Sequence, residues 1–285
     1  MTQAEIARSA EERGDARRAL RLAERYRDAL DLPGAWNETL DVLLGHRSVR
    51  AFLPDAVPAD TVELLVAAAQ SAASSSNLQP WSVVAVEEPE RKARLAVLAG
   101  DQKHIVRAPL FLVWLIDLYR LERIGQARGT TTGGLDYLET LLLGAVDTAI
   151  AAQNAVVALE SLGLGAVYIG GIRNKPAEVA CELGLPPHVV ALVGLSVGYP
   201  DADAPASVKP RLPQRAVLFR EQYRQGHDAD AIAAYDRRLR SFQREQGMTE
   251  RDWSEQATTR VRDAAALSGR HVLQETLRGL GFGLK

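Results

Sequence analysis

A cluster of cationic and hydroxyl side chains occupies the hexapeptide Gly45-His46-Arg47-Ser48-Val49-Arg50, directly after a mostly apolar run. In an extended chain the side chains alternate, with Ser48 and Arg50 on one side and Arg47 and Val49 on the other. Arginine and hydroxyl groups in such a strip can bind a phosphate through several hydrogen bonds. Taken alone, however, the hexapeptide slightly favours a solvated basic edge.

A second cationic segment, Lys209-Pro210-Arg211, lies far along the chain. Its proline fixes the backbone, so the two cations sit on a rigid mount suited to phosphate contacts. An exposed basic turn explains the same residues, and by itself this segment favours that reading. Two polar loops, 74–79 and 102–104, add hydroxyl and amide groups; for the first, a ligand-lining loop and a plain loop are equally supported.

The segment Tyr168-Ile169-Gly170-Gly171 reads as a strand that runs into two glycines, where a planar ligand can lie against the backbone. A dinucleotide-binding fingerprint is rejected for the nearby Gly163 and Gly165. These glycines follow a helix and precede a strand, whereas the fingerprint follows a strand and opens a helix.

Other chemistries find little support. The histidines show no metal-ligand spacing and Cys181 has no second cysteine, so no metal site is expected. Cys181 is interpreted as core packing. Ser196 matches the letters of a nucleophile elbow, but Tyr199-Pro200 follows instead of a helix, so it is interpreted as a strand residue. The remaining donor-rich segments suit an electron-rich, phosphorylated cofactor better than hydrolysis.

Composition indicates an ordinary globular protein. The 285 residues are 47% hydrophobic and 25% charged, with a formal net charge of −2, which argues against nucleic-acid or membrane-surface binding. One cysteine fits a reducing compartment, and we expect a cytoplasmic protein. The apolar stretch 141–162 is interrupted by polar residues, so a membrane span is not expected.

Periodicity predicts helices over residues 2–31 (interrupted at Gly14), 36–44, 61–73, 89–99, 135–162 and 174–183. Strands are expected at residues 82–87, 109–118, 166–171 and 188–198, a mobile loop at 123–134, and helices over 214–285. The helix 135–162 has little polar surface, so it should be largely buried, as the centre of a domain or the seam of a dimer.

The order of these segments resembles the nitroreductase family, and most closely its NADPH-dependent, oxygen-insensitive (type A) nitroreductase and flavin reductase branch. The resemblance covers about residues 39–260. It rests on GHRSVR, SSSNLQ, GDQKH, LLLGAVDTAIAAQNA, VYIGGIRN and KPRLP. It implies an α/β (α+β) fold: a three-layer α-β-α sandwich with a mixed, mainly antiparallel sheet around a long buried helix. The expected domains are an N-terminal helical extension (1–35), without a recognised counterpart, and an FMN domain (36–285) that includes a C-terminal helical excursion at about 214–285.

The resemblance also implies a homodimer with FMN at the subunit interface. His46, Arg47, Ser48, Lys209 and Arg211 would bind the phosphate end of FMN. Arg50 and Gln102 would face the pyrimidine edge of the flavin, where Arg50 would stabilise the reduced form. The remaining cofactor contacts would come from Ser74, Ser75, Ser76 and Asn77 of the partner subunit and from Tyr168, Ile169, Gly170 and Gly171 along the ring.

The implied activity is that of an NAD(P)H oxidoreductase. Hydride would pass from NADPH, or alternatively NADH, through flavin N5 to nitroaromatics, quinones or free flavins in a ping-pong cycle, without a side-chain nucleophile or base. Arg244 and Arg251, which flank Gln246-Gly247, are the candidates for NADPH binding, although their spacing departs from the family pattern. The alternative is a flavin-binding or storage protein without turnover that recruits a partner through its N-terminal arm.

Overall fold

The computed structural model describes residues 3–28, 30, 32, 34–204 and 206–285. It divides into two compact units, each built from two segments of the chain. The helical unit comprises Met1–Arg47 and Ser207–Ala266, and the sheet unit comprises Ser48–Ala206 and Leu267–Lys285. This division differs from the predicted boundary at residue 35, because the N-terminal extension and most of the C-terminal excursion belong to the same unit.

A four-stranded sheet forms the middle of the sheet unit, in the order β1-β2-β4-β3. The strands are β1 (Trp81–Val86), β2 (Leu110–Asp117), β3 (Gly165–Ile169) and β4 (Val189–Gly198). All three strand pairings are antiparallel, and a parallel contact is added by a single bridge between Ser48 and Ala166. As predicted, β2 is central; its apolar, largely aromatic and branched residues are buried up to Ile116.

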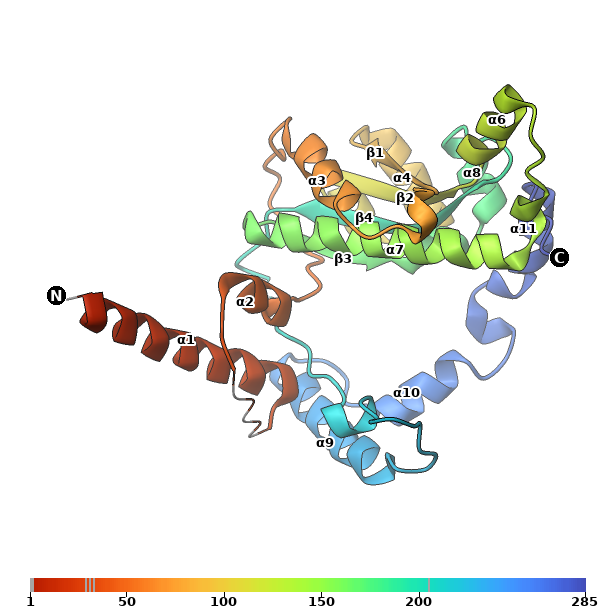
Figure 1. The fold of residues 1–285 in the computed structure, drawn as a ribbon. Coiled ribbons are helices and arrows are strands. Elements are labelled where there is room, and N and C mark those ends of the chain that lie inside the picture. Colours follow the sequence, from red (N-terminus) through yellow and green to blue (C-terminus); the bar gives the residue numbers. More distant parts are fainter. Residues whose placement is uncertain (1–2, 29, 31, 33, 205) are drawn as a thin grey trace. The chain divides into compact units, whose positions relative to one another are not determined.

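The two faces of the sheet carry separate hydrophobic cores, which gives the three layers that the sequence resemblance predicts. Leu110, Leu112 and Trp114 of β2 pack against α3 (Thr61–Gln70) and α7 (Leu138–Ser161). The alternate residues of β2 point to the other face, as the strand period requires. The helices that cover this other face are α4 (Pro89–Leu98), α5 (Lys103–Arg107) and α8 (Pro176–Glu182). Figure 1 shows α7 running along the sheet.

Helix α7 is buried on one face only. Gly144 allows its close approach to the sheet, since an added Cβ would lie 2.7 Å from Cγ2 of Ile116. Asp147 and Thr148 are buried on the same face. A second face exposes apolar side chains four residues apart, at Leu138, Leu142, Val146 and Ile150. By length and composition α7 would also suit a membrane span, but its buried face belongs to the core of the sheet unit.

The rest of the sheet unit consists of α6 (Tyr119–Arg128), α11 (Leu273–Gly279) and the short 3-10 helices η1 (Ser75–Asn77), η2 (Gly133–Asp136), η3 (Gly170–Arg173) and η6 (Arg270–Val272). The predicted mobile loop at 123–134 is therefore wrong in its first half, which is helical as far as Arg128. Gly125 inside this helix leaves room for Thr132, whose Cγ2 would lie 2.2 Å from an added Cβ.

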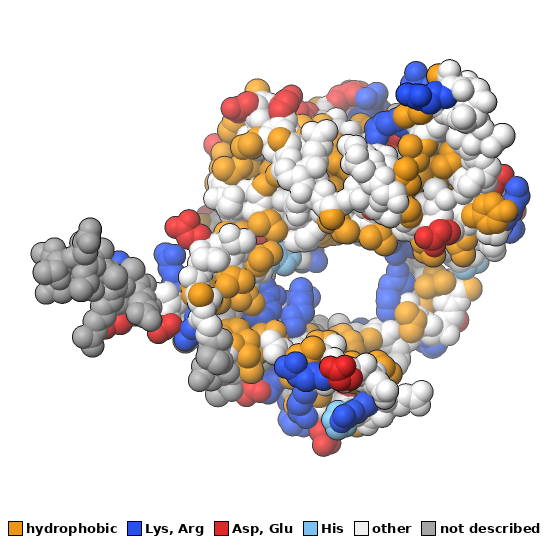
Figure 2. Space-filling view, in the orientation of Figure 1, with side chains coloured by type: hydrophobic (Ala, Val, Ile, Leu, Met, Phe, Trp, Pro, Cys, Tyr) orange, Lys and Arg blue, Asp and Glu red, His pale blue; other side chains and the backbone are white. Residues whose placement is uncertain are grey.

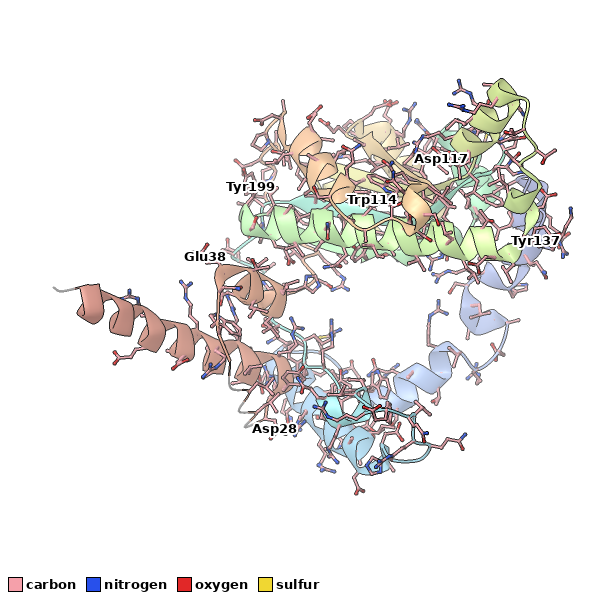
Figure 3. The ribbon with its side chains drawn as sticks, in the orientation of Figure 1. Asp28, Glu38, Trp114, Asp117, Tyr137 and Tyr199 are labelled. Atoms are coloured by element: carbon pink, nitrogen blue, oxygen red, sulfur yellow. The ribbon has the colours of Figure 1, made fainter. Side chains whose placement is uncertain are left out.

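The helical unit contains α1 (Gln3–Tyr26), α2 (Glu38–Gly45), η4 (Gln214–Ala216), α9 (Ala229–Glu245) and α10 (Trp253–Arg260); a further 3-10 turn, η5 (Ala265–Leu267), follows α10. Helix α1 continues through Gly14, so the predicted interruption there is wrong. Directly after α1, Arg27 contacts α9: it hydrogen-bonds Glu245 at 2.5 and 2.6 Å and lies 5.2 Å from the ring centre of Phe242. Arg238 of α9 donates to Asp28, which Figure 3 labels at this end of α1.

Candidate active site

The basic hexapeptide begins where α2 ends. Asn37 caps the N-terminus of α2 by accepting a hydrogen bond from the Leu40 N–H at 3.0 Å. Arg21 of α1 donates hydrogen bonds of 3.0 and 3.2 Å to the carboxylate of Asp41. This pairing with Arg21 lowers the pKa of Asp41. His46 follows the helix and is half-buried, and Arg47 is exposed.

The second half of the hexapeptide belongs to the sheet unit. The Val49 N–H donates to the carbonyl of Ala166 at 2.9 Å, and the Val49 side chain is 3% exposed. Ser48 and Arg50 are exposed. The predicted alternation is therefore confirmed at these three residues, and it leaves Ser48 and Arg50 available to a ligand.

Arg25, in the last turn of α1, joins the two cationic segments. Its side chain is 6% exposed, and its guanidinium donates to the carbonyls of Leu44 at 2.9 Å and His46 at 2.6 Å. It also donates to the carbonyl of Lys209 at 3.0 Å. Residues 46 and 209, which are far apart in sequence, are thus held on the same guanidinium.

The segment Lys209-Pro210-Arg211 is fixed through its backbone. The Arg211 N–H donates to the carbonyl of Arg25 at 3.0 Å, and the Tyr235 hydroxyl donates to the carbonyl of Pro210 at 2.8 Å. Burial raises the pKa of Tyr235, which keeps this hydroxyl a donor. Pro210 is buried while Lys209 and Arg211 are exposed. Both cations are therefore exposed, as in the basic turn that the segment by itself favours, and they lie on a backbone that these hydrogen bonds fix.

In the sheet unit, Arg50 lies close enough to His104 to act on its charge. Burial, and after it the charge of Arg50, lower the pKa of His104. Gln102 is half-buried, and its carbonyl accepts from the Ile105 N–H at 2.9 Å at the start of α5. The charge of Arg50 thus reaches His104 of α5, and Gln102 is the residue that precedes this short helix.

Gly170 and Gly171, which follow β3, differ in the space that a side chain would have. A Cβ on Gly171 would lie 2.2 Å from the carbonyl oxygen of Ala99, so this residue serves packing. A Cβ on Gly170 would meet Nη2 of Arg173 at 3.6 Å and Nη1 of Arg270 at 3.9 Å, which is ordinary contact. Only Gly170 therefore offers the open backbone that a planar ligand needs.

Ile169 and Tyr168 complete this strand end. Ile169 is 3% exposed, so its side chain belongs to the core and only its backbone can serve a ligand. Tyr168 is half-buried; burial and then the charge of Glu160 raise the pKa of its hydroxyl, which bonds Oε1 of Gln153 at 3.4 Å.

The serine-rich loop is anchored from within α7. Ser74 Oγ donates to Oδ2 of Asp147 at 2.6 Å, and the Ser75 N–H donates to both carboxylate oxygens at 3.2 Å. The Gln79 N–H donates to Ser74 Oγ at 2.9 Å. Ser75, Ser76 and Asn77 expose their side chains, and Asn77 also lines a cavity of about 610 Å³ with Trp81 and Arg120.

Of the NADPH candidates, Arg244 lies in the last turn of α9 and Arg251 lies on the connection between α9 and α10. Arg244 forms a forked ion pair with Glu250, with both bonds at 2.8 Å. Gly247, at φ 64°, turns the chain after α9. The exposed Arg251 donates its N–H to Oε1 of Gln243 at 2.8 Å. The two arginines thus lie at the end of α9 and on the segment after it, and Arg244 is already paired to the Glu250 carboxylate.

Comparison with known proteins identifies the family to which these segments belong. Residues 43–199 match the nitroreductase family, and residues 209–285 match its C-terminal domain. The chain belongs to the nitroreductase family. An "Oxygen-insensitive NADPH nitroreductase" of Salmonella typhimurium is 43% identical over 219 residues, covering 76% of this chain and 88% of the relative. An "FMN reductase (NADPH)" of Bacillus subtilis is 38% identical over 225 residues, covering 77% and 90%.

Solved structures agree with this assignment. The structure titled "NADPH:FMN oxidoreductase from Vibrio harveyi complexed with NAD+" superposes with a TM-score of 0.77 at 34% identity, covering 87% of this chain and all (100%) of the other. The fold predicted from the resemblance is therefore confirmed. Helix α1 precedes both matched ranges, the first of which starts at residue 43.

The residues present fit FMN in their chemistry. The helical unit offers the exposed cations of Arg47, Lys209 and Arg211 for a phosphate. The sheet unit offers Arg50, the amide of Gln102, and the open backbone at Gly170 for a polar ring edge and face. None of the assigned side chains is a carboxylate, which would repel the phosphate.

Sequence reasoning missed two residues that position this set and misjudged a third. Asp147 is one of the polar residues that interrupt the apolar stretch 141–162, and a lone acid in such a helix is itself a signal. Arg25 lies in the predicted N-terminal helical extension and has no distinguishing sequence pattern. Cys181 is exposed, so its assignment to the core was wrong: Val179 and Ala180 fill the buried face of α8. Ser196 is a buried residue of β4, as predicted.

Proposed function

We propose that this protein catalyses two-electron reduction of nitroaromatics, quinones or free flavins by NADPH in a ping-pong cycle, with FMN as its bound cofactor. It is an oxidoreductase: its relatives are named as NADPH nitroreductase and FMN reductase. The alternative of flavin storage without turnover finds no support among these names. The exposed thiol of Cys181 suits a reducing compartment, so we infer that the enzyme acts in the cytoplasm.

One observation carries the cofactor assignment. Arg25 binds the carbonyls of His46 and Lys209 with one guanidinium, which holds the two cationic segments of the helical unit together. A single basic segment suits any exposed edge, but two segments converging from distant parts of the chain suit a phosphate. We assign His46, Arg47, Lys209 and Arg211, with Ser48 of the sheet unit, to the phosphate end of FMN.

The sheet unit supplies the residues for the ring. Bound FMN would supply the two-electron redox chemistry. Arg50 would stabilise the negative charge that reduction adds at the pyrimidine edge. The lowered pKa of His104 keeps that imidazole neutral near pH 7, so it does not compete with Arg50 as a cation. Gln102 would hydrogen-bond the same edge.

A homodimer is part of this proposal. The exposed stripe Leu138, Leu142, Val146 and Ile150 on α7 is too apolar for a surface that stays in water. Figure 2 shows hydrophobic side chains in a row along this helix. We propose that the stripe packs against a second copy, and that Ser74, Ser75, Ser76 and Asn77 contact the FMN of the partner. Arg244 and Arg251 are proposed to bind NADPH.

Anaerobic spectroscopy tests the function. The purified protein should be yellow, NADPH should bleach it without oxygen, and nitrofurazone or a quinone should restore the colour. Steady-state rates at several concentrations of both substrates should give parallel double-reciprocal lines, the signature of a ping-pong cycle. A flavin-loaded protein that NADPH does not bleach would favour the storage alternative instead.

A further inference from the structure

The last turn of α1 contacts both cationic segments of the helical unit, although α1 lies outside the ranges matched by the family. Arg25 is buried, at 6% exposure, and its guanidinium carries hydrogen bonds to Leu44, His46 and Lys209. Its own carbonyl accepts from the Arg211 N–H at 3.0 Å. One residue thus touches the backbone of both cationic segments, through its side chain and its main chain.

Neighbouring contacts hold this turn in place. Arg27 pairs with Glu245 at 2.5 Å and stacks on Phe242, and Arg238 donates to Asp28. Tyr26 lines a cavity of about 600 Å³ together with Lys209 and Arg211. The turn is therefore fixed on α9 and forms a wall beside the cations.

The hydrogen bonds from Arg25 to three carbonyls require a guanidinium. Its planar fork of N–H donors reaches several carbonyls in fixed directions, which a lysine ammonium on a flexible stem cannot reproduce. A buried donor also holds each carbonyl more firmly than water does, because a buried carbonyl that loses its hydrogen bond costs free energy. The spacing of His46 from Lys209 and Arg211 thus depends on Arg25.

We propose that Arg25 is a positioning residue for the phosphate of FMN: it sets the distance between His46 and the Lys209–Arg211 segment from an N-terminal extension. The proposal rests on the function proposed above, which assigns these cations to FMN. Arg25 itself acts through the backbone of its neighbours. Its effect should therefore depend on whether the ligand carries a phosphate.

The ratio of riboflavin to FMN affinity measures this dependence. Apoprotein of the wild type, Arg25→Met, Arg25→Lys and the control Arg17→Met is titrated with FMN and with riboflavin, and flavin fluorescence gives each Kd. We expect Arg25→Met to raise the Kd of FMN at least tenfold and that of riboflavin less than twofold. Arg25→Lys should lose part of the preference for FMN, and Arg17→Met, an exposed change on the same helix, should keep it.

The outcomes separate this inference from the proposed function. If the wild type binds neither flavin, the proposed function fails before Arg25 is tested. If the wild type prefers FMN and both Arg25 variants keep the same ratio, the positioning role is overturned. A purely structural role would weaken both ligands in parallel and lower the Tm of the apoprotein, and this result also overturns the proposal.

Discussion

Ser74 and Asp147 are joined by a hydrogen bond of 2.6 Å from the serine hydroxyl to the carboxylate, which ties the serine-rich loop to the inside of α7. Ser76, Asn77 and Gln79 in this loop have φ of 49°, 53° and 51°, a left-handed conformation that side chains disfavour. Because such strain persists only where neighbours enforce it, the bonds of Asp147 to Ser74 and Ser75, and of Ser74 to the Gln79 N–H, hold the loop at both ends.

Replacement of Asp147 by alanine should destabilise the protein. The carboxylate is 2% exposed, and its removal leaves the Ser74 hydroxyl and the Ser75 N–H without their acceptor, at about 1.5–3 kcal/mol. Urea unfolding followed by circular dichroism measures this loss. Asp147→Asn keeps one acceptor oxygen and should lose less, as should Ser74→Ala. Equal stability of Asp147→Ala and wild type would show that the loop is held by other contacts.

Arg211→Ala should weaken FMN binding without disturbing the fold. Arg211 is exposed, and its backbone bond to Arg25 survives the change. The lost charge-assisted bond to phosphate is worth about 1.5–3 kcal/mol, or a rise in Kd of about 10- to 150-fold. Fluorescence titration of apoprotein with FMN gives the value. Arg215→Ala, an exposed arginine of η4, is the control, and the same Kd in both variants would remove Arg211 from the site.

The fold was largely predictable because local patterns and long-range packing agree. β2 is apolar at every position from Leu110 to Ile116, and the structure places it at the centre of the sheet. Helix α7 shows the limit of such reasoning. Its composition predicts burial but does not say that Val146 faces outward, because that depends on which face the sheet covers.

The cationic segments were also found from residue types, whereas the residues that position them were not. Arg25 looks like any arginine of an amphipathic helix, and only the tertiary fold brings its guanidinium to the carbonyls of residues 46 and 209. The same holds for Gly171, whose glycine is needed for packing on Ala99 and not for a ligand. Contacts between distant segments leave no local pattern to read.

The stability of the protein should depend on pH through His104. Burial and the charge of Arg50 lower its pKa in the folded protein from an ordinary value of 6.5. Between these two pKa values the unfolded chain binds a proton that the folded protein does not, so the free energy of unfolding falls as the pH decreases through this window. His104→Gln should remove this part of the pH dependence, as measured by urea unfolding at pH 7.5 and 5.5.

The effect of the Arg50 charge on the pKa of His104 can be measured directly. Arg50→Gln should raise the pKa of His104, which an NMR titration of its ring proton detects, because the repelling charge is gone. Arg128→Gln, an exposed change on α6, should leave that pKa unaltered. An unchanged pKa in Arg50→Gln would falsify the proximity of Arg50 to His104 on α5.

Dimer formation should depend on the outer face of α7. Val146 is 57% exposed and Val97 of α4 is 60% exposed, so glutamate at either position meets a similar surface in the isolated chain. If α7 packs against a second copy, only Val146→Glu buries a charge at an apolar interface, which is strongly unfavourable. Sedimentation velocity should then show a dimer for the wild type and Val97→Glu, and a monomer for Val146→Glu. Since Ser74–Asn77 are proposed to reach the FMN of the partner, the monomer should also bind FMN more weakly; a dimeric Val146→Glu would move the interface away from this stripe.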